Sequence, residues 1–339
     1  MITKAIHTLV SGGDLSVDLT KQAFGDILSG KATDAQIASF ITALRIKGET
    51  IDEITACAAV MREKSITIRP TIDVLDIVGT GGDYADTFNV STVASFVISA
   101  GGTAVAKHGN RSVSSKCGSA DVLEALGVNI EVSPEKSERL LHEIGLCFLY
   151  APLYHSSMKY AMPARKQLGM RTIFNILGPL SSPAAANLCL VGVYDEALVT
   201  PLAMVLKNLG VKRAMVVCGH DGLDEISLST STTVCEVNNG AVNSFFLNPR
   251  QLGLPLCDPA ELKGGGIARN KAIALDILSG KKDAKRNMVV LNAAVCLYMA
   301  QSDSTLRDCV KLAENLIDSG KAMAKLNEFI SRSNEEVCL

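Results

Sequence analysis

The stretch Val74-Leu75-Asp76-Ile77-Val78-Gly79-Thr80-Gly81-Gly82-Asp83 decides the fold class of this chain. Its first five residues are mainly apolar and β-branched, which predicts a short buried strand. The glycines that follow at once predict a tight turn. A strand followed by a loop occurs again downstream. A helix is predicted over residues 90–100, a strand over residues 103–106, and a polar segment follows that strand.

Strands and helices alternate along most of the chain that follows. Apolar runs at residues 191–194, 214–218 and 234–237 predict further strands. Ser133 with proline next to it, and Gly145, mark the start and the end of another helix. This alternation is typical of an α/β fold with a mostly parallel central sheet flanked by helices.

Residues 1–70 predict only helices. Thr33 with Gln36, and Thr50 with Glu53, have the spacing of capping boxes, in which each side chain satisfies a free backbone amide at a helix start. We therefore predict a small N-terminal α-helical domain over residues 1–70 and a larger α/β domain over residues 71–339.

The ends of these helices also have sequence signals. Thr20 precedes an apolar-periodic segment that stops at Gly30. Gly48 is expected to end the next helix as a left-handed C-cap, and Pro70 closes the helical region.

The composition excludes several classes of protein. The 339 residues are 47% hydrophobic, and the net charge of -2 leaves no basic excess for holding a nucleic-acid backbone. The ten cysteines form no C-x-x-C pair, so we expect small buried residues in a reducing cytoplasm, with neither a zinc site nor a disulfide scaffold. The longest apolar stretch, residues 288–300, contains Asn292 and is too short to span a bilayer, and residues 1–10 do not resemble a signal peptide.

Two segments predict a phosphate site. Glycines at residues 79–83 let backbone amides turn toward an anion, and residues 89–92 begin a helix whose N-terminus also favours an anion. Residues 107–115 follow the next strand and place two cations, one imidazole, one amide and three hydroxyls at the same sheet edge. The structural alternatives are a tight turn with an ordinary helix cap and a solvated surface loop.

Two further features predict a metal site and a site that binds a carboxylate ligand. Asp224 and Glu225 follow a predicted strand. Carboxylates are hard oxygen ligands, and Mg²⁺ commonly binds one or two of them. The structural alternative for such a pair is a solvated turn. Arg165 can hold a carboxylate with two parallel hydrogen bonds, although a helical arginine usually lies on the surface.

These segments, in this order, resemble the anthranilate phosphoribosyltransferase family. The resemblance covers nearly the whole chain and is carried by residues 43–50, 79–83, 89–92, 107–115, 118–127 and 171–180. It implies an enzyme that transfers the 5-phosphoribosyl group of phosphoribosyl diphosphate to the amine of anthranilate, the second step of tryptophan biosynthesis from chorismate. It also implies a cytoplasmic homodimer with the two-domain fold of the pyrimidine nucleoside phosphorylases, in which helices from about residues 165–188 join the helical domain.

The resemblance implies the following site residues. Phosphoribosyl diphosphate is expected to contact Gly79, Gly82, Asp83, Thr87, Asn89, Val90, Ser91, Thr92, Lys107, His108, Gly109, Asn110, Arg111, Ser112, Val113, Ser114, Ser115 and Ser119. Anthranilate is expected to contact Gly79, Asn110 and Arg165, with His108 and His155 nearby. Two Mg²⁺ ions per active site are expected on Ser91, Asp224 and Glu225. No covalent nucleophile is expected, because an aromatic amine is neutral at pH 7 and the reaction needs mainly positioning and electrostatic stabilisation.

Three alternatives remain. A pyrimidine nucleoside phosphorylase shares the fold and a similar loop at residues 107–111, but it binds inorganic phosphate without a pair of divalent cations. A non-catalytic nucleic-acid-binding relative would need a basic surface and a damaged magnesium site. A dinucleotide-binding protein would need a third glycine at position 84, where this chain has Tyr84. The acidic pair Asp224 and Glu225 and the block at residues 165–180 favour the transferase.

Overall fold

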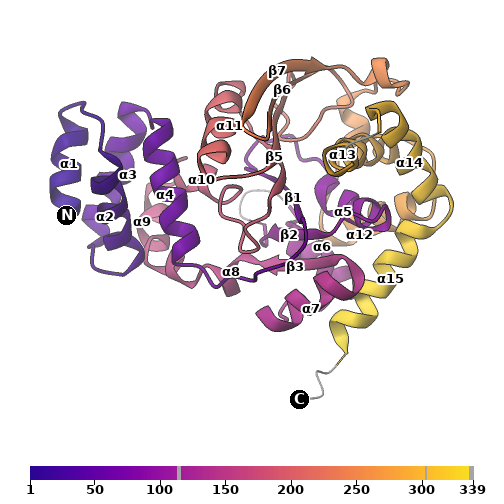
Figure 1. Ribbon diagram of the computed structural model, residues 1–339, viewed down its shortest axis with the longest axis horizontal. Helices are drawn as coiled ribbons and strands as arrows, with labels where there is room; N and C mark the ends of the chain where they lie inside the picture. Colours follow the sequence, from indigo (N-terminus) through magenta and orange to yellow (C-terminus); the bar gives the residue numbers. More distant parts are fainter. Residues whose placement is uncertain (113–115, 302–303, 336–339) are drawn as a thin grey trace.

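A bundle of helices forms one end of the molecule (Figure 1). The computed structural model describes residues 1–112, 116–301 and 304–335, and its first helices are α1 (Ile2–Val10), α2 (Val17–Leu28), α3 (Asp34–Lys47) and α4 (Ile51–Glu63). Two helices from much later in the chain, α9 (Met162–Leu168) and α10 (Phe174–Leu177), pack against α3 and α4 respectively. The bundle is therefore built from two segments that are distant in sequence.

The helix starts confirm the capping boxes and correct one boundary. The Thr33 and Thr50 hydroxyls each accept a hydrogen bond from the backbone N–H three residues on, and both boxes are complete. The predicted start at Thr20 is wrong, because the Ser16 side chain caps α2 and Thr20 lies inside it. Gly48 ends α3 with φ 88° and ψ 125°, so its φ is positive but its conformation is not the predicted left-handed helical one.

The rest of the chain folds around a seven-stranded sheet with the order β3-β2-β1-β4-β5-β6-β7. The first five strands in this order pair in parallel and the last two pairings are antiparallel, which confirms the predicted α/β fold with a mostly parallel sheet. The strands are β1 (Leu75–Gly79), β2 (Val105–Gly109), β3 (Leu146–Tyr150), β4 (Leu188–Gly192), β5 (Arg213–Gly219), β6 (Thr232–Asn238) and β7 (Ala241–Leu247).

Two aspects of the strand prediction were wrong. β3 and β7 were not predicted, because β3 follows a helix with only Gly145 between them and β7 has a mostly exposed, irregular pattern. β2 also lies further along the chain than predicted. Lys107, His108 and Gly109, which were expected in a loop, are its last three residues, since they pair in register with β3.

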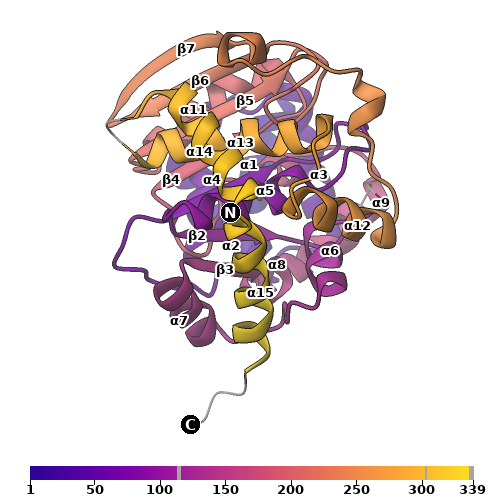
Figure 2. The ribbon, with the colours of Figure 1, turned by 90° about the vertical axis from the view of Figure 1, so that its right-hand side faces the viewer.

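Helices cover both faces of the sheet. On one face α5 and α13 pack together over β1, and α14 and α15 lie outside them, with α15 running from the centre of the view to its lower edge in Figure 2. On the other face α11 packs against β5 and β6 and also contacts α4 of the bundle. The helices of this part are α5 (Val90–Ala100), α6 (Ser119–Leu126), α7 (Pro134–Ile144), α8 (Ala151–Tyr154), α11 (Val199–Asn208), α12 (Ile267–Leu278), α13 (Ala284–Ala300), α14 (Leu306–Asp318) and α15 (Lys321–Asn334). Short 3₁₀ helices lie at Ser156–Tyr160, Glu196–Leu198, Pro249–Leu252 and Pro259–Leu262.

The central strands are buried on both faces, as parallel strands between helical layers are. In β4, Leu188 and Leu190 face the core beneath α5 and α13, while Cys189 and Val191 face the core shared with the bundle. Cysteines contribute to both cores: of the nine that the structure describes, eight are buried and Cys257 is half-buried. Over the described residues, no helix has the length and apolar character that crossing a membrane requires.

Glu53 connects three segments of the bundle and supplies a stability test. Its buried carboxylate accepts hydrogen bonds from the backbone N–H groups of Leu15 and Thr50 (2.9 and 2.8 Å) and from Lys47 Nζ (2.9 Å). Glu53→Ala should lower the free energy of unfolding by about 3 kcal/mol, because two backbone N–H groups lose their acceptor and the nearly buried Lys47 ammonium keeps only Asp14 as a carboxylate partner. Urea denaturation measures this change. Glu63→Ala, at an exposed ion pair on the same helix, is the control, and an equal loss in both variants would contradict the role of Glu53.

Candidate active site

The sheet has one point at which its strand order reverses. From β1 the chain passes to β2 and β3 on one side, whereas β4 returns to the other side of β1 and leads on to β5. β1 and β4 therefore lie side by side, and their last residues, Gly79 and Gly192, are directly paired. Ligands of open parallel sheets bind beyond the carboxyl ends of the strands at such a point.

Asp224 occupies this point, and two glycines make room for it. A Cβ atom on Gly79 would lie 2.3 Å from Asp224 Oδ2, and one on Gly192 would lie 1.6 Å from the Asp224 carbonyl oxygen. The Gly81 N–H donates to Asp224 Oδ2 (2.6 Å), which joins the glycine loop to this carboxylate. Gly192 was missed by the sequence analysis, although a glycine that ends an apolar run is a signal for close approach of another segment.

Glu225 contacts the N-terminus of α5, which in turn contacts Lys107 near the end of β2. The Ser91 N–H, in the first turn of α5, donates to Glu225 Oε1 (3.3 Å). Lys107 Nζ donates to Ser91 Oγ (3.1 Å) and to the Ile77 carbonyl oxygen (2.8 Å). The structure thus brings together the glycine loop, Ser91, Lys107, Asp224 and Glu225, which the sequence placed in four separate segments.

The electrostatics of this cluster favour a cation. Desolvation raises the pKa of Asp224, and repulsion from Asp83 adds to the shift. Desolvation and repulsion from Asp224 raise the pKa of Glu225, while the Lys107 ammonium acts in the opposite direction. Asp224 and Glu225 share the buried Lys107 ammonium with Asp76, and a bound cation would stabilise the ionised forms of the acidic pair.

The donor set fits Mg²⁺ in particular. Within the described residues, no group of three or more His, Cys, Asp or Glu side chains could hold a metal ion with protein ligands alone. Mg²⁺ commonly takes only one or two carboxylates and completes its shell with water and substrate phosphates. Asp224, Glu225 and the Ser91 hydroxyl provide that kind of partial shell beside a helix N-terminus that suits a phosphate.

Several buried polar atoms around the cluster have no protein partner. In the part of the chain that the structure describes, they include Thr80 Oγ1, Asn89 Oδ1, Thr92 Oγ1, His108 Nε2 and Thr172 Oγ1. Buried polar atoms in folded proteins are nearly always hydrogen-bonded, so such a concentration indicates a surface prepared for a polar ligand.

Two histidines form a neutral pair next to the cluster. The rings of His108 and His155 lie 5.0 Å apart between centroids, and each residue is 5% exposed. Burial lowers the pKa of His108 to about 3 and that of His155 to about 4, so both rings are neutral at pH 7. The backbone N–H of His108 donates to Asp76 Oδ1 (3.1 Å), a carboxylate buried within β1. Asp76 was missed as a contributor to the site, although an acid inside an apolar strand is a signal for one.

Other predicted residues lie at the same edge, with contacts of their own. Asp83 Oδ1 accepts from the Ala85 N–H (3.2 Å), Thr87 forms a bridge with Lys263, and Val90 is buried, so only its backbone faces outward. Gly109 has no room for a side chain, since a Cβ there would lie 2.2 Å from Ser119 Oγ.

The segment after β2 folds onto α6. Arg111 donates to Glu124 (2.8 and 3.0 Å) and to Asp121 (3.2 Å), so two carboxylates already balance its charge. The Ser112 N–H also donates to Asp121 (3.0 Å), and Ser119 Oγ donates to the Asn110 carbonyl oxygen (3.2 Å). Val113, Ser114 and Ser115 lie outside the described residues.

Arg165 lies on α9, on the bundle side of this edge. Its guanidinium carbon is 5.0 Å from the centre of the Phe174 ring, and its nearest polar contact is Met162 Sδ (3.7 Å). Over the described chain no carboxylate pairs with it, and burial lowers its pKa. It is therefore available to a carboxylate ligand.

Asn292 holds the acidic loop from behind and was also missed. Its amide accepts from the Ile226 N–H (3.0 Å) and donates to the Ile226 carbonyl oxygen (3.1 Å), next to Glu225. A lone amide within the apolar run of α13 is the signal that could have identified it.

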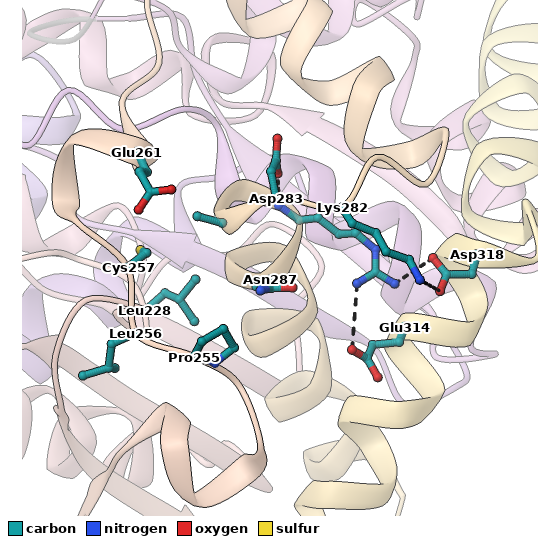
Figure 3. A pocket seen from close by; sticks show the side chains of 12 residues that line it. Leu228, Pro255, Leu256, Cys257, Glu261, Lys282, Asp283, Asn287, Glu314 and Asp318 are labelled. Atoms are coloured by element: carbon teal, nitrogen blue, oxygen red, sulfur yellow. Dashed lines mark hydrogen bonds and ion pairs between the residues drawn. The ribbon is translucent and has the colours of Figure 1, made fainter.

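A cavity of about 540 Å³ lies away from this site (Figure 3). It lies between the start of α13, the residues around Pro255, and α14. Its buried guanidinium, Arg286, is already paired with Asp318 (2.7 Å) and lies 3.8 Å from Glu314. Since these charges are satisfied by one another, we assign the cavity no ligand.

Both parts of the chain match known protein families. Residues 3–65 match the family described as "Glycosyl transferase family, helical bundle domain", and residues 71–323 match "Glycosyl transferase family, a/b domain". The chain is 65% identical to an anthranilate phosphoribosyltransferase of Ruminiclostridium cellulolyticum, over 98% of each chain. Its structure resembles that of an anthranilate phosphoribosyltransferase from Thermus thermophilus (TM-score 0.93, 38% identity, 98% of this chain and 99% of the other). It also resembles one from Saccharomyces cerevisiae in complex with PRPP and Mg (TM-score 0.89, 30% identity, 98% of this chain and 97% of the other).

The histidine pair predicts a pH dependence of stability. Unfolded His155, with an ordinary pKa of 6.5, takes up a proton below that pH, whereas the folded residue stays neutral until about pH 4. Its contribution is therefore complete above pH 6.5 and is lost as the pH falls, by about 2 kcal/mol between pH 7 and pH 5. Urea denaturation at both pH values should show a smaller drop for His155→Gln than for the unsubstituted chain. His7→Gln, on the exposed side of α1, is the control, and an unchanged drop in His155→Gln would contradict the assignment.

Proposed function

The chain belongs to the anthranilate phosphoribosyltransferase family, and on that premise we propose how its residues carry out the reaction. The enzyme transfers the 5-phosphoribosyl group of phosphoribosyl diphosphate to the amine of anthranilate, giving N-(5-phosphoribosyl)anthranilate and diphosphate, the second step of tryptophan biosynthesis from chorismate. The observation that carries the proposal is the position of Asp224 between Gly79 and Gly192, with Glu225, Ser91 and Lys107 around it.

We propose that the diphosphate of the sugar donor binds between the glycine loop and the N-terminus of α5. The residues are Gly79, Gly82, Asp83, Thr87, Asn89, Val90, Ser91 and Thr92, together with residues 107–115 and Ser119. The positive end of the α5 dipole and the ammonium of Lys107 supply positive charge there. The buried atoms Thr80 Oγ1, Asn89 Oδ1 and Thr92 Oγ1 provide further hydrogen bonds.

Magnesium use is supported by the yeast relative in complex with PRPP and Mg and by the donor set of this chain. We propose two Mg²⁺ ions per site, held by Ser91, Asp224 and Glu225. When bound, they neutralise charge on the departing diphosphate. Asn292 keeps Glu225 in place through its two hydrogen bonds to Ile226.

We propose that anthranilate lies against Gly79, Asn110 and Arg165, with His108 and His155 beside it. The unpaired guanidinium of Arg165 suits the carboxylate of anthranilate. The two neutral imidazoles suit an uncharged aromatic ring and amine, because neither adds a charge to be desolvated.

The chemistry then requires positioning more than proton transfer. The amine nitrogen bonds to the anomeric carbon while the bond from that carbon to diphosphate breaks, and the nitrogen then releases one proton to solvent. Backbone N–H groups and Lys107 stabilise charge on the leaving group in a site with little water. No residue needs to attack the sugar, so we propose a direct displacement without a covalent enzyme intermediate.

We also propose the organisation of the whole enzyme. Residues 1–70, joined by helices from about residues 165–188, form the helical domain, and the remainder of residues 71–339 forms the domain that binds phosphoribosyl diphosphate. A homodimer through the helical domain is supported by the exposure of Ile46 (81%) and Met162 (49%) on its surface. The buried cysteines suit a cytoplasmic location.

A fluorescence assay of anthranilate consumption tests the function directly. With phosphoribosyl diphosphate and Mg²⁺, anthranilate fluorescence should change with time, and chelation of the metal should stop the change. Consumption that needs neither the sugar donor nor a divalent cation would overturn the proposal.

Arg165→Ala should raise the KM for anthranilate by about tenfold to a hundredfold while leaving the KM for phosphoribosyl diphosphate nearly unchanged, because a charge-assisted contact to one substrate is lost. Steady-state kinetics with each substrate varied in turn measures both constants. Arg45→Ala, an exposed arginine on α3, is the control. Unchanged anthranilate kinetics in Arg165→Ala would remove this residue from the anthranilate site.

Asp224→Asn combined with Glu225→Gln should raise the Mg²⁺ concentration needed for half-maximal activity by at least about tenfold, because amides are weaker ligands for a hard cation. A magnesium titration of activity measures this value. Asp276→Asn, at an exposed carboxylate on α12, controls for loss of negative charge. A parental titration curve in the double variant would exclude both residues as metal ligands.

A further inference from the structure

Arg171 lies between two tyrosine rings beside the glycine loop. Its guanidinium carbon is 5.1 Å from the centre of the Tyr84 ring and 3.8 Å from that of the Tyr194 ring. Arg171 Nη2 also donates to the carbonyl oxygen of Gly82. We call this arrangement the Tyr84/Arg171/Tyr194 stack.

The stack joins three segments that are distant in sequence. Tyr84 directly follows the glycine loop at residues 79–83, and Tyr194 follows the end of β4, two residues after Gly192. Arg171 lies in the connection between α9 and α10, which pack against the helical bundle. In the described structure no carboxylate pairs with Arg171, so its contacts are the two rings and the loop carbonyl.

The backbone at Tyr84 is in an unfavourable conformation. Its φ is 57°, in the left-handed region that a bulky residue rarely adopts, and Gly81 and Gly82 before it also have positive φ. The side chain is 82% exposed, so burial does not explain its position. Contact with Arg171 explains the position of the Tyr84 side chain, because a guanidinium is attracted to the face of an aromatic ring and its planar shape stacks there.

We propose that Tyr84 and Arg171 are positioning residues that hold the glycine loop in the conformation that binds the diphosphate, and that they connect this loop to the segment bearing Arg165. The proposal rests on the proposed site for phosphoribosyl diphosphate. Two hydrogen bonds also hold the loop. The Thr80 N–H donates to the Gly192 carbonyl oxygen (2.9 Å), and the Gly81 N–H donates to Asp224, a carboxylate that we assign to the metal. The stack provides a contact to the loop that does not depend on that carboxylate.

Three variants test this role. Tyr84→Leu removes the ring, Arg171→Lys keeps the charge but removes the planar guanidinium, and Tyr84→Phe keeps the ring. Steady-state kinetics should show that the first two raise the KM for phosphoribosyl diphosphate about tenfold, with less than about a twofold change in the KM for anthranilate. Tyr84→Phe should retain the parental constants. In the double variant Tyr84→Leu with Arg171→Lys, the effects should be less than multiplicative, because both remove one shared interaction.

The chain offers a matched control. Tyr160 is 40% exposed and lies under Lys159, whose Nζ is 5.1 Å from the ring centre, but this pair lies in the 3₁₀ helix at Ser156–Tyr160. Tyr160→Leu should leave the KM for phosphoribosyl diphosphate unchanged. Thermal unfolding of all variants should differ little, because Tyr84 is exposed and Arg171 is only half-buried.

The outcomes separate this inference from the proposed function. If the unsubstituted chain consumes no anthranilate, the proposed function fails. If it is active and Tyr84→Leu or Arg171→Lys matches it, only the positioning role is overturned. A rise of both KM values together with a lowered melting temperature would mean that the residues are merely structural, which also overturns the role.

Discussion

The close approach of Asp224 to two paired glycines is the constraint on which the site depends. Asp224 crosses the ends of β1 and β4, where a side chain on Gly192 would collide with its main chain and one on Gly79 with its carboxylate. This crossing exists only because the strand order reverses between those two strands, which opens a crevice at the sheet edge. The metal-binding carboxylates, the glycine loop and the start of α5 can then meet within hydrogen-bond distance.

Holding Asp224 and Glu225 close together has an electrostatic cost when no ligand is bound, and the surrounding structure offsets that cost. Asp224 and Glu225 are held close together although each opposes the ionisation of the other, with Lys107 as the counter-charge. The Asn292 amide fixes the backbone next to Glu225 from α13, and Asp76 fixes the backbone of His108 from β1. None of these supports has to touch a substrate, yet each determines where a substrate-binding group lies.

Prediction from sequence worked best where a feature depends on neighbours in the chain. The capping boxes at Thr33 and Thr50 were found because their partners lie three residues away. It chose the wrong local cap at α2, which starts at Ser16 and not at Thr20. It failed at β2 because pairing with β3, a tertiary contact, extends that strand through Lys107 and His108. Arg111 shows the same limit, because its charge is balanced by carboxylates on α6 that no spacing rule connects to it.

The sequence alone determined the alternation of strands and helices, the glycine turn after β1, and the types of chemical group present, since these follow from periodicity, backbone freedom and side-chain chemistry at short range. Only the tertiary structure decided that Gly192, Asp76 and Asn292 belong to the site, and that Arg171 stacks between Tyr84 and Tyr194. The reason is that these contacts join residues far apart in the chain, and their existence depends on strand order and helix packing, which local patterns do not encode.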